Sequence, residues 1–151
     1  MRKEDGLSII EIILALTIII GLIIAGYTAL KKWGENKKIE DIKGNMLLIQ
    51  GKCKILKEGK KVNKTEDSTL IGSKISDNRE NEIVAEFLNK KILDEEKLEE
   101  YYFLTDEDLK SLGLDLKNEA NSYYIVNYEE NTVFITSGYN NDENIEYKLS
   151  E

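Results

Sequence analysis

The hydrophobic and polar positions divide the chain into an apolar stretch, a stretch of helical period and a stretch that alternates. The apolar stretch runs from Leu7 to Leu30 and holds one charged residue, Glu11, among 24 residues. A helix of this length spans about 36 Å at about 1.5 Å per residue, more than the roughly 30 Å hydrocarbon core of a bilayer. We therefore predict a membrane-spanning helix over residues 7–30.

Glu11 opposes membrane insertion without preventing it. An acidic residue costs about 2.5–3.5 kcal/mol at the centre of a membrane helix and less near its end. Each Leu or Ile contributes about −0.3 to −0.6 kcal/mol, and the stretch holds fourteen of them. Because a carboxylate inside a membrane needs a partner, Glu11 is a candidate functional residue.

After the apolar stretch, apolar residues recur in steps of three and four, the period of one helix face. The stripe consists of Ile39, Ile42, Met46, Ile49, Cys53 and Leu56, and we expect Leu47, Leu48 and Ile55 to widen it. The chain has no proline to interrupt a helix here. The pattern predicts an amphipathic continuation of the helix over residues 31–58, with its apolar stripe packed on a head domain.

The head, residues 59–151, begins with elements of mixed character. Residues 59–76 form a polar connector, and Ser76 or Asp77 is expected to cap a helix that ends near Lys91. Residues 93–104 start helical, and their Tyr101–Phe103 portion suits either a short strand or a packed loop. Thr105 is the expected N-cap of a short acidic helix, which Gly113 ends.

From Ser122 the period changes to two, which indicates strands. We predict strands over 123–128 and 132–136 joined by a turn at 129–131, then a turn-rich loop over 138–144 and a third strand over 145–149. The predicted fold class is α+β. One long N-terminal helix, membrane-spanning in its first half, packs on a small antiparallel sheet with one or two short helices.

Charge is distributed unevenly along a chain of net charge −8. Residues 31–64 hold eleven lysines against four acidic residues, and residues 65–151 hold eight basic against 22 acidic residues. The acidic head of one subunit could set its register on the basic segment of another, or the lysines could meet anionic lipid headgroups. A solvated surface is the third reading. Nucleic acid is not an expected partner, because the head is acidic.

Few residues suggest site chemistry. The chain has no histidine, a single cysteine outside any activating motif, and no glycine-rich phosphate loop, so we expect no enzyme and no catalytic residues. The segment with Asp142, Glu143 and Glu146 is rich enough in oxygen ligands to be a candidate Ca²⁺ site. A solvated hairpin loop has the same composition, and otherwise no cofactor is expected.

The N-terminus carries a recognisable arrangement. A short charged leader ends in Gly6, the apolar residue Leu7 follows, and Glu11 stands five places after the glycine. This resembles the class III signal sequence of type IV prepilins and pseudopilins. The resemblance implies cleavage after Gly6 by a prepilin peptidase and N-methylation of Leu7. It also implies an assembly contact between Glu11 and the N-terminal ammonium of a neighbouring subunit.

The resemblance implies a pilin architecture with a leader over residues 1–6. It further implies a structural subunit, a minor pilin or pseudopilin, of a type IV pilus or type II secretion-like filament. Its partners would be other subunits and the inner assembly platform, first in the cell membrane and then in a surface filament. The single Cys53 excludes an intrachain disulfide and favours the Gram-positive type. Alternatives are a competence pseudopilin for DNA uptake and an unprocessed single-pass protein with an adhesive or sensory ectodomain.

Charge and resemblance predict opposite orientations. Two basic residues, Arg2 and Lys3, precede the apolar stretch, and five lysines follow within the next fifteen or so residues. The positive-inside rule alone would place the C-terminal part in the cytoplasm. Processing of the leader requires the N-terminus there instead, and we therefore expect the head outside the cytoplasm.

Overall fold

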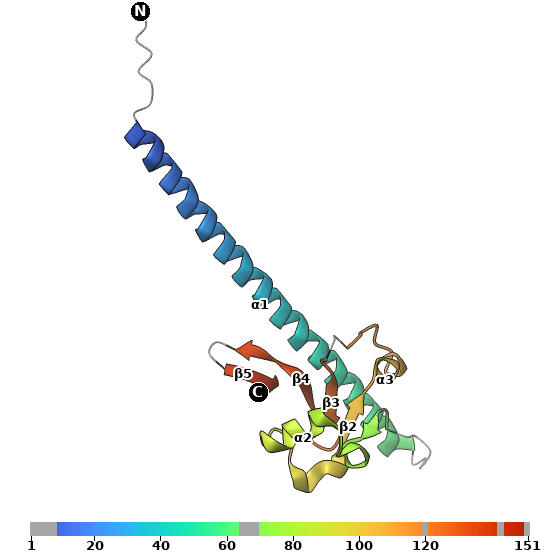
Figure 1. The fold of residues 1–151 in the computed structure, drawn as a ribbon. Coiled ribbons are helices and arrows are strands. Elements are labelled where there is room, and N and C mark those ends of the chain that lie inside the picture. Colours follow the sequence, from blue (N-terminus) through green and yellow to red (C-terminus); the bar gives the residue numbers. More distant parts are fainter. Residues whose placement is uncertain (1–8, 64–69, 119–120, 142–143, 150–151) are drawn as a thin grey trace, which may run out of the picture. The chain divides into compact units, whose positions relative to one another are not determined.

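The computed structural model describes residues 9–63, 70–118, 121–141 and 144–149. The chain divides into two compact units, Met1–Lys38 and Ile39–Glu151, and each is described by itself. Helix α1, Ile9–Asn63, contributes residues to both units (Figure 1). The predicted helix is thus confirmed over its described part. The polar connector was predicted to start at residue 59, and this start is wrong, because α1 continues to Asn63. A single glycine, Gly59, does not end the helix, and the chain has no proline that would.

The second unit holds a five-stranded antiparallel sheet in the order β1-β2-β3-β4-β5. The strands are β1 (Ser73–Lys74), β2 (Tyr101–Leu104), β3 (Tyr124–Asn127), β4 (Thr132–Asn141) and β5 (Asn144–Lys148). Its helices besides α1 are α2 (Glu82–Asn89), α3 (Asp106–Ser111) and the 3-10 helices η1 (Ile75–Asn78) and η2 (Glu95–Glu100). The α+β class with a pilin-like fold is confirmed, with five strands where about three were expected.

The C-terminal strands correct a prediction. Residues 138–144 were expected to form a loop, but β4 continues to Asn141 and β5 begins at Asn144. Gly138 permits this, because it adopts a φ of +65° at an irregularity in the β4–β5 pairing. A Cβ atom there would lie 2.5 Å from Cγ2 of Ile145. The glycine that suggested a turn therefore bends a strand and lets β5 pack against it.

The helix caps are partly as predicted. Asn81 caps α2 and accepts a 2.9 Å hydrogen bond from the Ile83 N–H, so the expected caps Ser76 and Asp77 are wrong and belong to η1. Thr105 caps α3 as expected, in a capping box with Asp108. Gly113 follows that helix in the left-handed region, with a φ of +74°.

Two clusters of buried side chains cover opposite faces of the sheet, because successive strand residues point to opposite sides. One cluster joins Met46, Ile49 and Cys53 of α1 with α3 and one sheet face. The other joins Val84 and Phe87 of α2 with the opposite face. The second unit is therefore three-layered, with the sheet between α1 and α2.

The helical stripe of α1 is confirmed at all six positions, since Ile39, Ile42 and Leu56 pack against the cluster that buries the other three. The expected widening of this stripe is wrong. Leu47, Leu48 and Ile55 are 57%, 54% and 67% exposed. At about 100° per residue, these three lie on the side of the helix away from the sheet.

Candidate functional site

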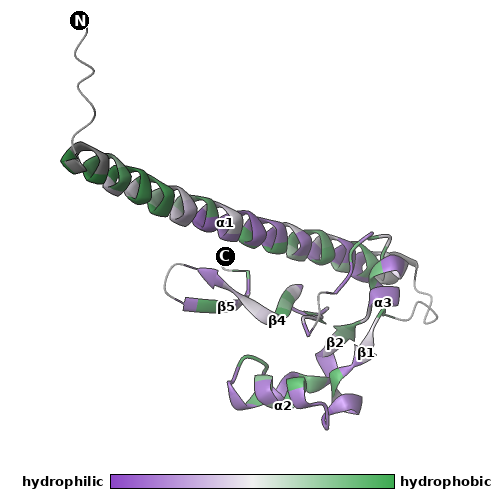
Figure 2. Ribbon diagram, turned by 45° about the horizontal axis from the view of Figure 1, so that its top comes forward, coloured by the Kyte–Doolittle hydropathy of each residue, from purple (hydrophilic) through white to green (hydrophobic). Residues whose placement is uncertain are grey.

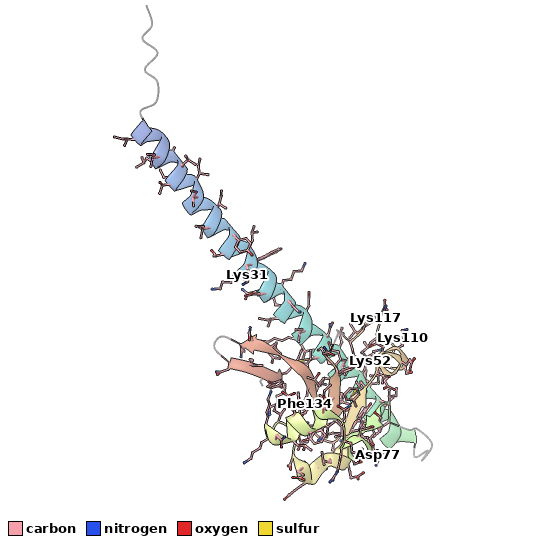
Figure 3. The ribbon with its side chains drawn as sticks, viewed as in Figure 1. Lys31, Lys52, Asp77, Lys110, Lys117 and Phe134 are labelled. Carbon is pink, nitrogen blue, oxygen red and sulfur yellow. The ribbon has the colours of Figure 1, made fainter. Side chains whose placement is uncertain are left out.

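The candidate site is an apolar surface of α1 that each unit leaves uncovered. In the first unit, every large apolar side chain described between Ile13 and Leu30 is at least 52% exposed. Figure 2 shows this part of α1 as nearly uniformly hydrophobic, and Figure 3 shows its side chains projecting from the helix. Burying one Leu or Ile side chain is worth about 1.5–3 kcal/mol, so ten of them favour apolar surroundings by on the order of 10 kcal/mol.

The two threonine hydroxyls within this segment are satisfied by the helix itself. The Thr17 hydroxyl donates to the Ile13 carbonyl at 2.8 Å, and the Thr28 hydroxyl donates to the Ala25 carbonyl at 2.9 Å. Neither side chain needs water as a partner. Among the described residues, α1 is the one helix long and apolar enough to cross a membrane.

The end of the apolar segment carries residues suited to a membrane–water interface. Tyr27 and Trp33 are exposed aromatic side chains, and the Lys37 ammonium lies 5.9 Å from the ring centroid of Trp33. Lys31 and Glu35 form an exposed ion pair at 4.0 Å, one helical turn apart. Aromatic rings and lysines of this kind are enriched where a helix leaves the hydrocarbon region.

In the second unit, the uncovered surface of α1 is a strip, which we call the outer strip. It consists of Gly44, Leu47, Leu48, Gly51 and Ile55. A Cβ atom added at either glycine would meet no described atom within 4 Å, so the strip is flat as well as apolar. Sequence periodicity assigned its three large residues to the core, because they flank the buried stripe. Gly44 and Gly51, which lie on the same side of the helix as these three residues, were the sequence feature that indicated a separate surface.

Contacts with the sheet fix which side of α1 carries the outer strip. The Gln50 amide donates to the Asn131 carbonyl at 2.7 Å. The Lys43 ammonium lies 5.1 Å from the ring centroid of Tyr139, which is buried in β4. Because these contacts and the buried stripe lie on one side of the helix, the outer strip is held on the other.

Of the N-terminal site residues predicted from sequence, the structure describes only the backbone of Glu11. Gly6 and Leu7, the predicted processing and methylation positions, lie outside the described residues. Glu11 lies in α1, and its side chain lies outside what is described. Cleavage after Gly6, methylation of Leu7 and pairing by Glu11 therefore stay predictions.

Of the three candidate Ca²⁺ ligands, only Glu146 lies among the described residues. Asp142 and Glu143 lie outside the described residues. The Glu146 carboxylate accepts a 2.7 Å hydrogen bond from the Asn141 amide, and its other oxygen lies 3.2 Å from the Tyr139 hydroxyl. Within the described ranges, no group of three His, Cys, Asp or Glu side chains could hold a metal ion. Burial, together with this carboxylate, raises the pKa of Tyr139 to about 12.

Cys53 is a core residue and not a reactive thiol. It is 2% exposed, and burial raises its pKa to about 11, against a weaker opposing effect of its hydrogen bond with Tyr128. The thiolate that reacts with oxidants or metals is therefore scarce near neutral pH. The Tyr128 hydroxyl in turn donates to the Ile71 carbonyl at 2.8 Å.

Comparisons of the chain with protein-family models, with curated proteins and with solved structures find no match. Its fold and its uncovered surface define the class of protein as an α+β, pilin-like chain that has, in the part the structure describes, one helix that could cross a membrane.

Proposed function

We propose that the chain is a structural subunit, a minor pilin or pseudopilin, of a type IV pilus or type II secretion-like filament. The observation that carries this proposal is the exposed apolar surface of α1 from Ile13 to Leu30. Such a surface requires apolar surroundings, and two are available to a filament subunit. The bilayer surrounds the helix before assembly, and the helices of other subunits surround it afterwards.

The outer strip supports a filament more than a solitary membrane anchor. A single-pass anchor needs apolar side chains only across the bilayer, whereas Leu47, Leu48 and Ile55 lie beyond the aromatic and lysine residues that end the apolar segment. Gly44 and Gly51 leave room for another helix to approach closely. A subunit that packs its helix among the helices of other subunits buries both the apolar segment and the outer strip.

Glu11 has a specific role in this proposal. After cleavage behind Gly6, the new N-terminal ammonium of one subunit pairs with the Glu11 carboxylate of its neighbour. Each charge reduces the cost of burying the other in surroundings of low dielectric constant. The head then lies outside the cytoplasm, against the lysine count and in agreement with the processing that the leader requires.

Mass spectrometry of the native N-terminus tests the proposal directly. A mature chain that begins with methylated Leu7 is the expected result. An intact leader would overturn the filament proposal in favour of an unprocessed single-pass membrane protein. Neighbouring genes for a secretion ATPase or for competence would separate a pilus from a DNA-uptake system.

A second experiment tests the contact. The Glu11→Ala chain should still insert and be cleaved, but its share in sheared surface filaments should fall several-fold. Glu35→Ala is the matched control, because it removes a carboxylate beyond the apolar segment. Normal incorporation of Glu11→Ala would contradict the pairing.

A further inference from the structure

The second unit carries a cavity that the proposed filament function does not use. It lies beside β5, on the sheet face that α2 covers, and has a volume of about 430 Å³. Phe134, Ile92 and Tyr147 give it apolar walls, and Lys91 and Lys148 also line it. Figure 3 labels Phe134, which belongs to β4 and is 5% exposed. The volume falls within the range of small-molecule sites.

Two lysines and one carboxylate, that of Glu146, line this cavity, although residues 65–151 carry 22 acidic against eight basic residues. Lys91 and Lys148 are exposed, and no described carboxylate forms an ion pair with either. The acidic lining residue, Glu146, already accepts a hydrogen bond from Asn141. Lys90 is occupied as well, by the Glu86 carboxylate and by the Tyr147 hydroxyl at 3.3 Å. Among the described residues, Lys91 and Lys148 therefore have no carboxylate partner and can meet an anion.

Lys91 occupies its position at a conformational cost. It follows α2 with a φ of +54°, where its N–H donates to the Leu88 carbonyl and the Ile92 N–H donates to the Phe87 carbonyl. These two hydrogen bonds form a Schellman motif, whose left-handed residue is usually glycine.

Helix α3 ends in the same motif with the usual residue. There the Gly113 N–H donates to the Lys110 carbonyl and the Leu114 N–H to the Leu109 carbonyl, with a φ of +74° at Gly113. The same turn thus holds glycine at the end of α3 and lysine where it lines this cavity. Strained backbone of this kind is concentrated at functional sites.

We propose that this cavity binds a small anionic ligand built on a ring, with the ring between Phe134, Ile92 and Tyr147 and its carboxylate or phosphate between Lys91 and Lys148. The apolar walls provide for the ring, and the two lysines provide for the charge. A cation is disfavoured by the same lysines, and a neutral ring gains nothing from them. The proposal is independent of filament assembly.

The test uses the full chain in nanodiscs of zwitterionic lipid, labelled with 4-fluorophenylalanine. Of the three phenylalanines, Phe134 lines the cavity, whereas Phe103 lies in β2 and is not among its lining residues. Phenyl phosphate should shift the Phe134 fluorine resonance, with a dissociation constant of about 1 mM for so small a ligand, and leave Phe103 unchanged. Phenol and inorganic phosphate each supply half of the ligand and should bind at least about tenfold more weakly.

Variants separate charge from backbone strain. Lys91→Asn tolerates the left-handed conformation without a charge, and we expect it and Lys148→Gln each to weaken binding about three- to tenfold. Lys110→Gln, a lysine outside the cavity, should bind as the wild type does. Lys91→Gly should weaken binding while raising the melting temperature of the head by about 4 °C, because it relieves the strain.

Three results would overturn the proposal. They are a Phe134 resonance unmoved by about 10 mM phenyl phosphate, phenol binding as tightly as phenyl phosphate, and wild-type affinity in both Lys91→Asn and Lys148→Gln. None of them bears on N-terminal processing. Failure of this proposal is therefore distinguishable from failure of the proposed filament function.

Discussion

The Lys57 ammonium lies 2.9 Å from both the carboxylate and the backbone carbonyl oxygen of Glu129. This contact joins the C-terminal part of α1 to the turn between β3 and β4. Together with the hydrogen bond from Gln50 to Asn131, it holds the helix on the sheet at two points along its length. The rotation of α1 about its own axis is therefore set within the second unit, and with it the residues that remain available to partners.

Two adjacent residues of α1 should respond in opposite ways to truncation. Ile49 is fully buried against the sheet, and Ile49→Ala should lower the free energy of unfolding of the head by about 2–5 kcal/mol. Leu48 is 54% exposed, and Leu48→Ala should change it by less than about 0.5 kcal/mol. Urea unfolding of the full chain in micelles, followed by near-ultraviolet circular dichroism, measures both. Equal losses would contradict the assignment of the two faces.

The same pair tests the filament. Under the proposed function, Leu48→Ala should lower incorporation into surface filaments while the head stays folded. Lys110→Ala, an exposed position of α3, is its control. Incorporation equal to that of the wild type would exclude Leu48 from the subunit contact.

Stability should fall at alkaline pH because of Cys53. Its pKa rises from about 9 in the unfolded chain to about 11 in the folded chain, so the unfolded state loses the proton first. The stabilisation is complete below pH 9 and is lost as the pH rises from about 9 to about 11. Between pH 8 and pH 10 the loss should be about 1.3 kcal/mol. Urea unfolding at the two pH values measures it.

Cys53→Ala is the control for this dependence, because it removes the titrating thiol and keeps burial, the main cause of the raised pKa values of Tyr128 and Tyr139. The alanine variant should lose about 1 kcal/mol less than the wild type between the two pH values. Equal losses in both chains would show that the thiol does not cause the effect. Slow modification of Cys53 by a thiol reagent in the folded state at pH 8 is a second expected sign of its burial.

Two glycines should respond oppositely to a methyl group. Gly138→Ala places a Cβ atom at a φ of +65° and 2.5 Å from Cγ2 of Ile145, and should destabilise the head by about 1–3 kcal/mol. Gly44→Ala adds a Cβ atom that meets nothing within 4 Å in a helix, and should stabilise it by about 0.5–1 kcal/mol. Thermal unfolding of both variants checks the signs. A stable Gly138→Ala chain would contradict the bend in β4.

The capping box of α3 gives a smaller effect. The Thr105 hydroxyl oxygen accepts a hydrogen bond from the Asp108 N–H at 3.2 Å, and the Thr105 N–H donates to the Asp108 carboxylate at 2.8 Å. Thr105→Ala should therefore cost about 1 kcal/mol of stability, whereas Thr105→Ser should cost little, because serine caps equally well. Chemical unfolding of the two chains measures the difference. Similar losses in both would assign the effect to the threonine methyl group.

Periodicity and local chemistry predicted the structural features that depend on residues close together in the sequence. The stripe of α1 from Ile39 to Leu56, the capping of α3 by Thr105 and the hairpin around residues 129–131 all follow from side chains close in sequence. In each case local hydrogen bonding and helical or strand period agree with tertiary packing. Where local preferences and tertiary packing agree, the structure of a segment can be predicted from its sequence.

Features that depend on tertiary contact were not predictable. Strand β1 has two residues and is defined by its pairing with Tyr102 and Phe103, which no local pattern announces. The place of Leu48 relative to Ile49 depends on which side of α1 the sheet occupies. The cavity beside β5 joins residues from the α2–η2 connection and two strands, and a left-handed lysine such as Lys91 has no sequence signature. These positions are fixed by the fold and not by their neighbours in the chain.

The hydroxyl groups of Thr17 and Thr28, each bound to a carbonyl of its own helix, have a consequence for movement between surroundings. A segment that satisfies these groups internally exchanges none of their hydrogen bonds when lipid around it is replaced by protein, or protein by lipid. From Ile9 to Leu30, the Glu11 carboxylate and the Tyr27 hydroxyl are then the polar side-chain groups that such a transfer affects. The relative stability of such a helix in lipid and in protein is therefore set by two side chains near its two ends.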